Sequence, residues 1–446
     1  MTNCTVTKLE FPAFKRLKIE AQFSGGDITS DGGALLLRAV DRRLKLTEQV
    51  AALMTDPRDP NKVQHPVVDL LRQRVYGLAC GYEDLNDHDT LRDDIAFQTA
   101  VEKDRVLGSR STLCRFEQRA DRALMWRVHE QMLEQFMASF DVPPESLILD
   151  FDATDDPVHG QQEGRFFHGY YRHYCFLPLY VFCGDHCLVS YLRPSNIDGA
   201  RHSWAILALL AKRLRQAWPK VSITLRGDSG FCRRNMLSWC ERNGIHYIVG
   251  LAKNPRLEQL SQPWVDRAKS QFDAQQQKQR LFAEFRYQAG TWKQGRRVVL
   301  KAEHMSQGSN PRYVVTNLPG DPQHLYEKNY CARGEMENRI KEQQLDLFAD
   351  RTSCSFWWPN QFRLLLSTLA YTLMNAIRRI ALQGTELAKA TCATIRLKLF
   401  KIGAVVIRNT RRVTLLLSSR YPYQGLFQTV CQKLDRKSTR LNSSHT

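Results

Sequence analysis

The chain has 446 residues, of which 43% are apolar and 25% charged, and its 64 Lys and Arg against 46 Asp and Glu give a formal charge of +18. At roughly 100–200 residues per domain the length suits several domains, and the ordinary apolar fraction excludes a wholly disordered chain. The longest apolar stretch, at residues 364–373, is shorter than the roughly 20 residues of a membrane helix. The N-terminus also lacks the apolar core of a secretion signal, so we expect a cytoplasmic protein without a membrane partner.

Residues 1–141 are predicted to form a helical, DNA-binding region. Apolar residues recur near helical spacing over residues 34–54, 67–78 and 120–140, which is typical of amphipathic helices. Residues 108–116 are predicted as a capped turn that leads into a short basic helix. This segment suits either a helix-turn-helix element or an ordinary helical hairpin, and the sequence leaves both interpretations open.

Residues 142–350 are predicted to form an α/β catalytic domain, which begins where the texture changes at Val142-Pro143-Pro144. A β-rich insertion is expected at about residues 254–325, because residues 280–316 lack helical periodicity. A helix at residues 330–348 follows the insertion. The elements predicted before the insertion have the order βββ-α-β-α-β. They are strands at 147–154, 174–182 and 188–192, a helix at 201–218, a strand at 221–225, a helix at 233–242 and a strand at 247–251.

Residues 351–434 are predicted to form a basic, helical C-terminal region, with a helix at residues 361–382. From residue 351 onwards there are 16 Lys and Arg against two acidic residues, which is +14 of the total charge of +18. Such one-sided charge favours a polyanionic partner, because each neutralised phosphate releases counterions. We therefore expect nucleic acid rather than an anionic membrane surface. Residues 435–446 are polar, contain no predicted element and resemble an unstructured, foreign tail.

Acidic residues at the ends of two predicted strands are candidates for metal-dependent chemistry. In LILDFDAT, Asp150 and Asp152 share one face of the strand, and an acid in an otherwise apolar strand is costly unless it binds something. Asp152 is nearer the carboxyl end and is preferred, with Asp150 as the alternative. Asp228 follows the strand VSITL and is flanked by Gly227 and Gly230, which let a ligand come close. Open α/β sheets place their ligand sites at such strand ends.

A third carboxylate is predicted on the helix at residues 330–348. At 3.6 residues per turn, Tyr330, Arg333, Glu337 and Lys341 share one face of this helix. Glu337 therefore lies between an arginine one turn earlier and a lysine one turn later. These cations suit DNA phosphates beside a metal-bound carboxylate, whereas an exposed helix with i,i+4 ion pairs produces the same pattern.

The chain resembles the DDE transposases of bacterial insertion sequences, and more closely the IS1380 family, which are relatives of the IS4 group. Three matches carry this resemblance across most of the chain. They are a D-x-T strand that contains Asp152, an R-x-DSGF segment that contains Asp228, and a Tyr-(2)-Arg-(3)-Glu signature formed by Tyr330, Arg333 and Glu337.

The resemblance implies a fold and a set of residue roles. The fold would be an RNase H-like mixed sheet with flanking helices, a β-rich insertion before the glutamate, and helical N- and C-terminal regions. The three carboxylates would bind two Mg²⁺ (or Mn²⁺) ions, and Tyr330 and Arg333 would contact the flanking DNA strand. The wider IS4 signature has a lysine seven residues beyond the glutamate, where this chain has Gln344, and Lys341 is the cation proposed in its place.

The predicted function is that of a DNA transposase that cleaves and joins DNA by in-line displacement with two metal ions. Its partners would be double-stranded DNA, as terminal inverted repeats and target DNA, and a second protomer in a homodimer on that DNA. Its place would be the bacterial cytoplasm, at the nucleoid. Two alternatives stay open: an RNase H-like structure-specific endonuclease, which would only hydrolyse DNA, and a non-catalytic DNA-binding protein derived from a transposase.

Overall fold

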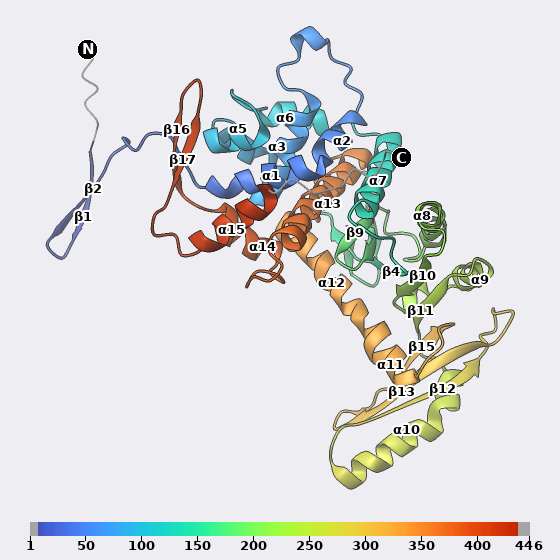
Figure 1. Cartoon of the computed structure of the whole chain (residues 1–446). Helices are drawn as coiled ribbons and strands as arrows, with labels where there is room; N and C mark the ends of the chain where they lie inside the picture. The colour runs from blue at the N-terminus through green and yellow to red at the C-terminus, as the bar shows by residue number, and fades with distance from the viewer. Residues whose placement is uncertain (1–7, 436–446) are drawn as a thin grey trace, which may run out of the picture. The chain divides into compact units, whose positions relative to one another are not determined.

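The computed structural model describes residues 8–435, which form two compact units (Figure 1). No helix in this part of the chain is long and apolar enough to cross a membrane. The tail predicted at residues 435–446 falls outside the described residues, apart from Asp435. The first unit comprises the described residues up to Ala120, Asp346–Phe348 and those from Leu369 onwards, and the second comprises Asp121–Leu345 and Ala349–Thr368.

The first unit consists mainly of helices and also contains two β-hairpins. Its helices are α1 (Leu35–Leu44), α2 (Leu46–Ala52), α3 (Val67–Cys80), α4 (His88–Leu91), α5 (Ile95–Val101), α6 (Arg110–Glu117), α14 (Cys392–Ile395), α15 (Gln424–Asp435) and the end of α13 (Trp357–Ile380). Strands β1 (Leu9–Phe14) and β2 (Leu17–Ala21) pair with each other, and β3 (Ile28–Thr29), β16 (Ala404–Arg408) and β17 (Val413–Leu417) form a three-stranded sheet. The terminal regions, predicted as helical, therefore contain these two hairpins in addition to their helices.

Local sequence explains these departures from the predicted helices. In β16 (AVVIR) the first residues alternate between buried and exposed, with Ala404 and Val406 facing inward, which is the period of two of a strand. The single helix predicted at residues 34–54 is divided at Lys45. This residue has a left-handed backbone conformation, with φ of 55°, and ends α1 before α2 begins.

The second unit is centred on a mixed nine-stranded sheet in the order β12-β13-β15-β11-β10-β4-β8-β9, with β14 paired to β13. Its strands are β4 (Ser146–Ala153), β8 (Leu179–Cys183), β9 (His186–Tyr191), β10 (Ser222–Gly227), β11 (His246–Leu251), β12 (Gln279–Tyr287), β13 (Arg296–Met305), β14 (Gly308–Ser309) and β15 (Arg312–Thr316). β10 is parallel to both β4 and β11, and the other neighbouring pairs are antiparallel. β5 (Asp156–Pro157), β7 (His173–Phe176) and β6 (Phe166–His168) form a separate small sheet.

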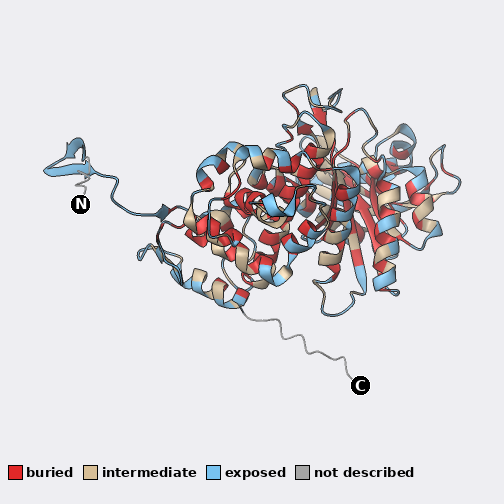
Figure 2. Ribbon diagram, turned by 90° about the horizontal axis from the view of Figure 1, so that it is seen from above, coloured by how far each residue is buried: buried red, intermediate tan, exposed pale blue. Residues whose placement is uncertain are grey.

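The core of the second unit lies between this sheet and its helices. Figure 2 shows the central strands as largely buried. Leu149 and Phe151 of β4 belong to one apolar cluster with Leu207 and Leu214 of α8 (Ser203–Ala217). Because side chains alternate along a strand, the opposite face of β4 carries Asp150 and Asp152. The helices of this unit are α7 (Arg122–Met137), α8 (Ser203–Ala217), α9 (Arg234–Arg242), α10 (Pro255–Gln275), α11 (Pro322–His324), α12 (Gly334–Lys341) and the start of α13.

The insertion expected at residues 254–325 contains the predicted strands and also a helix of 21 residues, α10. This helix begins with the side chain of Asn254 capping the backbone N–H of Leu257, and it lies against β12 and β13 (Figure 1). β15 pairs with β11. The strands of the insertion therefore extend the main sheet and do not form a second sheet.

The helix that carries the third carboxylate begins earlier than predicted. From Pro322 the chain is helical as far as Asp346, through α11, a π-helical turn at Leu325–Tyr330, a tighter turn at Cys331–Arg333, α12 and a second π-helical turn at Glu342–Asp346. π-Helical turns change the phase of side chains along a helix and are frequent at functional sites. The first of them ends at Tyr330, which is the first of the predicted signature residues.

Candidate active site

Two predicted carboxylates lie at the carboxyl ends of neighbouring strands. Asp152 is close to the end of β4, and Asp228 directly follows β10. The two strands are parallel, and their register aligns Phe151 with Gly227. The next residue of each strand is one of the two aspartates, so both occupy the same edge of the sheet. This edge is where open α/β sheets bind ligands.

Asp150, the alternative to Asp152, is bound by an arginine. Arg226 lies opposite it on β10 and donates two hydrogen bonds to its carboxylate, one of them from Nη2 to Oδ2 at 2.7 Å. Nη1 of the same guanidinium donates to the carbonyl oxygen of Asn329 at 2.6 Å. Burial raises the pKa of Asp150, and Arg226 opposes that rise. The buried pair therefore ties both strands to the helical run that carries the third carboxylate.

Tyr330 comes close to the end of β11 because the residue there is glycine. A Cβ atom on Gly250 would lie 2.6 Å from the hydroxyl oxygen of Tyr330 and 2.8 Å from the backbone nitrogen of Ser229. Ser229 follows Asp228, whose Oδ1 accepts a hydrogen bond from the backbone N–H of Gly230 at 2.9 Å. Burial raises the pKa of Tyr330, and the carboxylate of Asp228 contributes to the rise. The tyrosine therefore lies beside the second carboxylate.

The third carboxylate, Glu337, is linked to Asp152 by one guanidinium. Nη2 of Arg333 lies 2.7 Å from Oε1 of Glu337, which is one helical turn later, and Nη1 lies 3.7 Å from Oδ2 of Asp152. Burial by itself lowers the pKa of Arg333, but the charges of Asp152 and Glu337 outweigh burial and the pKa is raised. Arg333 thus holds together two carboxylates that come from different elements.

Asp152 lies within electrostatic range of both Asp228 and Glu337. Burial raises the pKa of Asp152 to about 7, with Asp228 and Glu337 acting in the same direction and Arg333 acting against them. The backbone N–H of Ala153 also donates to Oδ1 of Asp152 at 2.9 Å. The carboxylates therefore concentrate negative charge at this edge of the sheet. Arg333 balances part of that charge.

The chemistry of these donors fits a hard divalent cation. Mg²⁺ and Mn²⁺ prefer oxygen ligands, and here three carboxylates repel one another at one edge of the sheet. In the described part of the chain, no three His, Cys, Asp or Glu side chains are arranged to hold a metal ion, and the guanidinium of Arg333 contacts both Asp152 and Glu337.

Lys341 is the predicted site residue that stands apart from this group. It is exposed and, among residues 8–435, forms no ion pair with the three carboxylates. Gln344, at the position of the signature lysine, donates from Nε2 to the carbonyl oxygen of Asp155 at 3.0 Å. Asp155 also pairs with His173, at 2.9 Å between Oδ2 and Nε2. Gln344 therefore secures the loop that follows β4.

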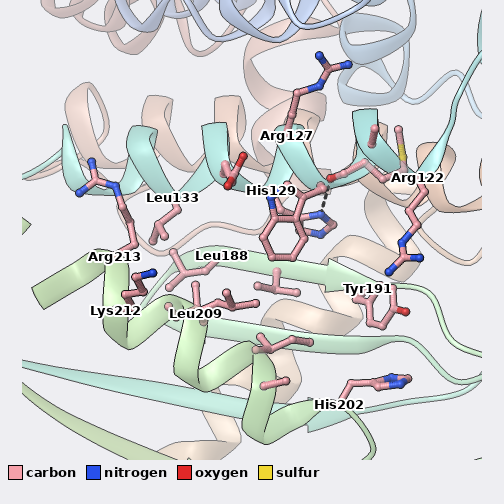
Figure 3. A pocket seen from close by; sticks show the side chains of 18 of the residues that line it. Arg122, Arg127, His129, Leu133, Leu188, Tyr191, His202, Leu209, Lys212 and Arg213 are labelled. Atoms are coloured by element: carbon pink, nitrogen blue, oxygen red, sulfur yellow. Dashed lines mark hydrogen bonds between the residues drawn. The ribbon is translucent and has the colours of Figure 1, made fainter. Parts of the chain in front are cut away.

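A pocket of about 1260 Å³ lies elsewhere in the second unit, between α7, α8 and β9 (Figure 3). Leu133, Leu188 and Leu209 line it, and none of the three candidate carboxylates does. The ring of His129 covers the strand edge, with Nε2 at 3.2 Å from the carbonyl oxygen of Ser190. The acidic sheet edge and this apolar pocket are separate features.

Two residues that shape the acidic edge were not among the predicted site residues, and only one of them carries a sequence signal. Gly250 interrupts the strand HYIVGL, and a glycine within a strand often marks the close approach of another group, so this signal was present. Asn329 acts through its backbone carbonyl oxygen. No pattern of side chains indicates such a role.

Comparisons with known proteins relate the chain to transposases. The family model described as "Transposase DDE domain group 1" matches residues 11–439. Among solved structures, the chain is similar to a piggyBac transposase in a synaptic complex with hairpin DNA, determined by cryo-EM, with 12% sequence identity, a TM-score of 0.42, and coverage of 92% of this chain and 83% of that one. No curated protein matches the chain. The family match includes every residue of the acidic edge.

Proposed function

The chain belongs to the family Transposase DDE domain group 1, and from this premise we propose that it is a DNA transposase that cleaves and joins DNA by Mg²⁺-dependent phosphoryl transfer. The observation that carries the proposal is the contact of the Arg333 guanidinium with both Asp152 and Glu337, beside Asp228. Asp152, Asp228 and Glu337 are the three acidic residues that the sequence motifs select. Transposases of this family generally depend on a divalent metal ion.

We propose an RNase H-like origin for the central part of the sheet. In chain order, β4, β8 and β9 form an antiparallel meander, and β10 and β11 continue the sheet on the other side of β4 as parallel strands. The crossovers contain α8 and α9. This succession agrees with the βββ-α-β-α-β order and supports the assignment, with β12, β13 and β15 as the family-specific extension.

The proposed roles follow from the positions of the side chains. Asp152, Asp228 and Glu337 would hold the metal ions. The hydrogen bonds from Arg226 to the buried carboxylate of Asp150 support Asp152 over Asp150 for this role. When bound, such ions stabilise the charge that develops on the phosphate oxygens during in-line displacement. Arg333, once released from the carboxylates, would bind a DNA phosphate through its planar guanidinium.

Tyr330 would contact the flanking strand next to Arg333, since its hydroxyl lies at the same sheet edge. Lys341, exposed at the end of α12, would contact a more distant phosphate. The resemblance to IS1380 elements adds the proposed substrate, DNA with terminal inverted repeats, and the proposed assembly, a homodimer on that DNA at the bacterial nucleoid.

The test is cleavage and joining by variants that remove one carboxylate at a time. Asp152→Asn, Asp228→Asn and Glu337→Gln should each lower nicking by more than about 100-fold, since even changes around metal ligands cost 10–100-fold. Binding of the same DNA should stay within about threefold. The assay uses purified protein, labelled duplexes taken from the flanks of the gene, and either Mg²⁺ or Ca²⁺.

A matched control is Glu335→Gln, which removes an exposed carboxylate from the same helix and should leave nicking unchanged. Full nicking by any of the three variants would remove that residue from the site. Strand joining of a pre-cut end separates a transposase from an endonuclease, which would only hydrolyse it. A wild-type protein that binds these ends and never cleaves them would be a non-catalytic DNA-binding protein.

A further inference from the structure

A basic hairpin rich in aromatic residues follows the first candidate carboxylate. It comprises residues 165–174, with the sequence RFFHGYYRHY, and is called the aromatic hairpin below. β6 and β7 form its two arms, and their register pairs Phe167 with Tyr174 and His168 with His173. None of the roles proposed above uses these side chains.

One face of the aromatic hairpin presents aromatic rings to solvent. Phe167 and Tyr174 are 56% and 46% exposed, and their rings lie edge to face at 5.7 Å between centroids. The guanidinium of Arg165 lies over the ring of Tyr174, 4.4 Å from its centroid. Tyr170, at the tip, is 83% exposed. Exposed apolar groups gathered in this way commonly mark a binding surface.

The opposite face attaches the aromatic hairpin to the acidic edge of the sheet. His173 pairs with Asp155 at 2.9 Å, and its ring stacks on that of Tyr171 at 6.0 Å. Burial raises the pKa of Tyr171 to about 12, with the carboxylates of Asp155 and Asp152 adding to the rise. The aromatic hairpin is therefore held, through His173, on the loop three residues after the first candidate metal ligand, Asp152.

The composition of the aromatic hairpin and the loop before it indicates which molecule fits this face. Residues 159–174 contain two Arg and three His against one acid, Glu163, and Glu163 already accepts a hydrogen bond from the backbone N–H of Trp357 at 3.0 Å. Aromatic rings interleaved with cations match the bases and phosphates of nucleic acid. Rings can stack only on bases that are unpaired, because a paired base inside a duplex exposes its edges and not its faces.

We propose that the aromatic hairpin binds unpaired nucleotides of the DNA substrate beside the cleavage site, with bases stacked on Phe167 and Tyr174 and phosphates held by Arg165 and Arg172. This inference rests on the proposed function, because the aromatic hairpin follows Asp152 in the chain and would meet the same DNA substrate. The chemical class of ligand is single-stranded DNA of any sequence, since every base has a face on which a ring can stack.

The test compares two duplexes with the same paired length, one blunt and one with a single-stranded overhang of about six thymidines. Binding to the full-length protein is measured in EDTA, so that no cleavage occurs. The wild type should bind the overhang duplex at least about tenfold more tightly, because stacking on aromatic side chains makes a contribution of this order for each base. The double variant Phe167→Ala/Tyr174→Ala should bind both duplexes equally.

Two further variants keep this test specific. Trp204→Ala removes a side chain that is 50% exposed on α8 and should leave the preference unchanged. Phe167→Tyr preserves a ring and should retain the preference. In addition, a 2-aminopurine base placed in the overhang should lose fluorescence on binding to the wild type and not to the double variant.

The inference is wrong if the wild type shows no preference, or if the double variant retains both the preference and the quenching. It is also wrong if the double variant only changes the oligomeric state, because the face would then bind a second copy of the chain. Cleavage with Mg²⁺ is scored separately. Cleavage without the preference overturns this inference alone, whereas the preference without cleavage overturns the proposed function alone.

Discussion

At the scale of single residues, Arg333 both contacts two of the carboxylates and balances part of their charge. Its guanidinium contacts Asp152 and Glu337 and so balances part of the repulsion that a metal ion would otherwise balance. Arg226 differs from it, because Arg226 is buried with Asp150 and also holds the carbonyl oxygen of Asn329. We infer that Arg226 keeps its partner permanently, whereas Arg333 exchanges its partners for a DNA phosphate.

The raised pKa of Asp152 predicts how stability depends on pH in EDTA. Its folded-state pKa of about 7 lies above the usual 3.8, so the folded chain binds more protons and the charged carboxylate destabilises it increasingly as the pH rises from 4 to 7. Asp152→Asn removes this cost. The variant should unfold with a free energy up to about 4 kcal/mol higher than the wild type at pH 8, since one pKa unit corresponds to about 1.4 kcal/mol, and up to about 1 kcal/mol higher near pH 4.5.

Urea denaturation at the two pH values measures this difference, with Glu335→Gln as the control that should follow the wild type. Mg²⁺ should then raise the melting temperature of the wild type and not that of Asp152→Asn. A wild type that is more stable than Asp152→Asn at pH 8 in EDTA would contradict the predicted sign.

At the scale of elements, the site depends on the close approach of the helical run to two strands. Arg226 of β10 binds the backbone at Asn329, and Gly250 of β11 leaves space for Tyr330. Both contacts involve the π-helical turn at Leu325–Tyr330. This turn therefore sets the position from which Arg333 and Glu337 reach the sheet edge.

Gly250→Ala tests this approach. The added methyl group would lie 2.6 Å from the Tyr330 hydroxyl oxygen and 2.8 Å from the nitrogen of Ser229, so either the helical run or the turn after β10 must move. Overpacking of this kind costs about 1–3 kcal/mol of stability. Nicking should be lost while DNA binding persists. Gly290→Ala, which meets nothing within 4 Å, is the control, and a fully active Gly250→Ala variant would show that the approach is unimportant.

At the scale of the whole molecule, the positive charge predicts how the proposed affinity for DNA depends on salt. The net charge is +18, and part of it lies at the exposed tip of the β16–β17 hairpin, at Arg411 and Arg412. Neutralised phosphates release counterions, so affinity falls with salt in proportion to their number. This contribution is independent of the DNA sequence and adds to the chemistry of the acidic edge.

The double variant Arg411→Gln/Arg412→Gln should reduce the slope of log affinity against log salt concentration by roughly 2, because each phosphate contact contributes about 0.9. The reduction should be equal for duplexes of unrelated sequence. Arg411→Lys/Arg412→Lys keeps both charges and should behave as the wild type. Titrations by fluorescence anisotropy at several salt concentrations measure the slope, and an unchanged slope would remove this hairpin from the DNA-binding surface.

Local patterns in the sequence account for a large part of the second unit. The alternation in LILDFDAT predicts β4, and the observed strand is Ser146–Ala153. The spacing of Arg333 and Glu337 predicts a shared helix face, and the two side chains form an ion pair. Other elements depend on partners far away in the chain. α10, and the extension of the main sheet by β15 through its pairing with β11, have no counterpart in the sequence-based prediction.

The sequence by itself determined the features that depend on neighbours within a few residues: strand ends that bear Asp152 and Asp228, a helical turn that joins Arg333 to Glu337, and an excess of positive charge. Only the tertiary structure decided that β4 lies beside β10, that Gly250 admits Tyr330, and that the aromatic hairpin contacts the loop after β4. The physical reason is the separation along the chain between the residues that interact. Periodicity is set by local backbone geometry, whereas these contacts join residues whose separation in the chain carries no local signal.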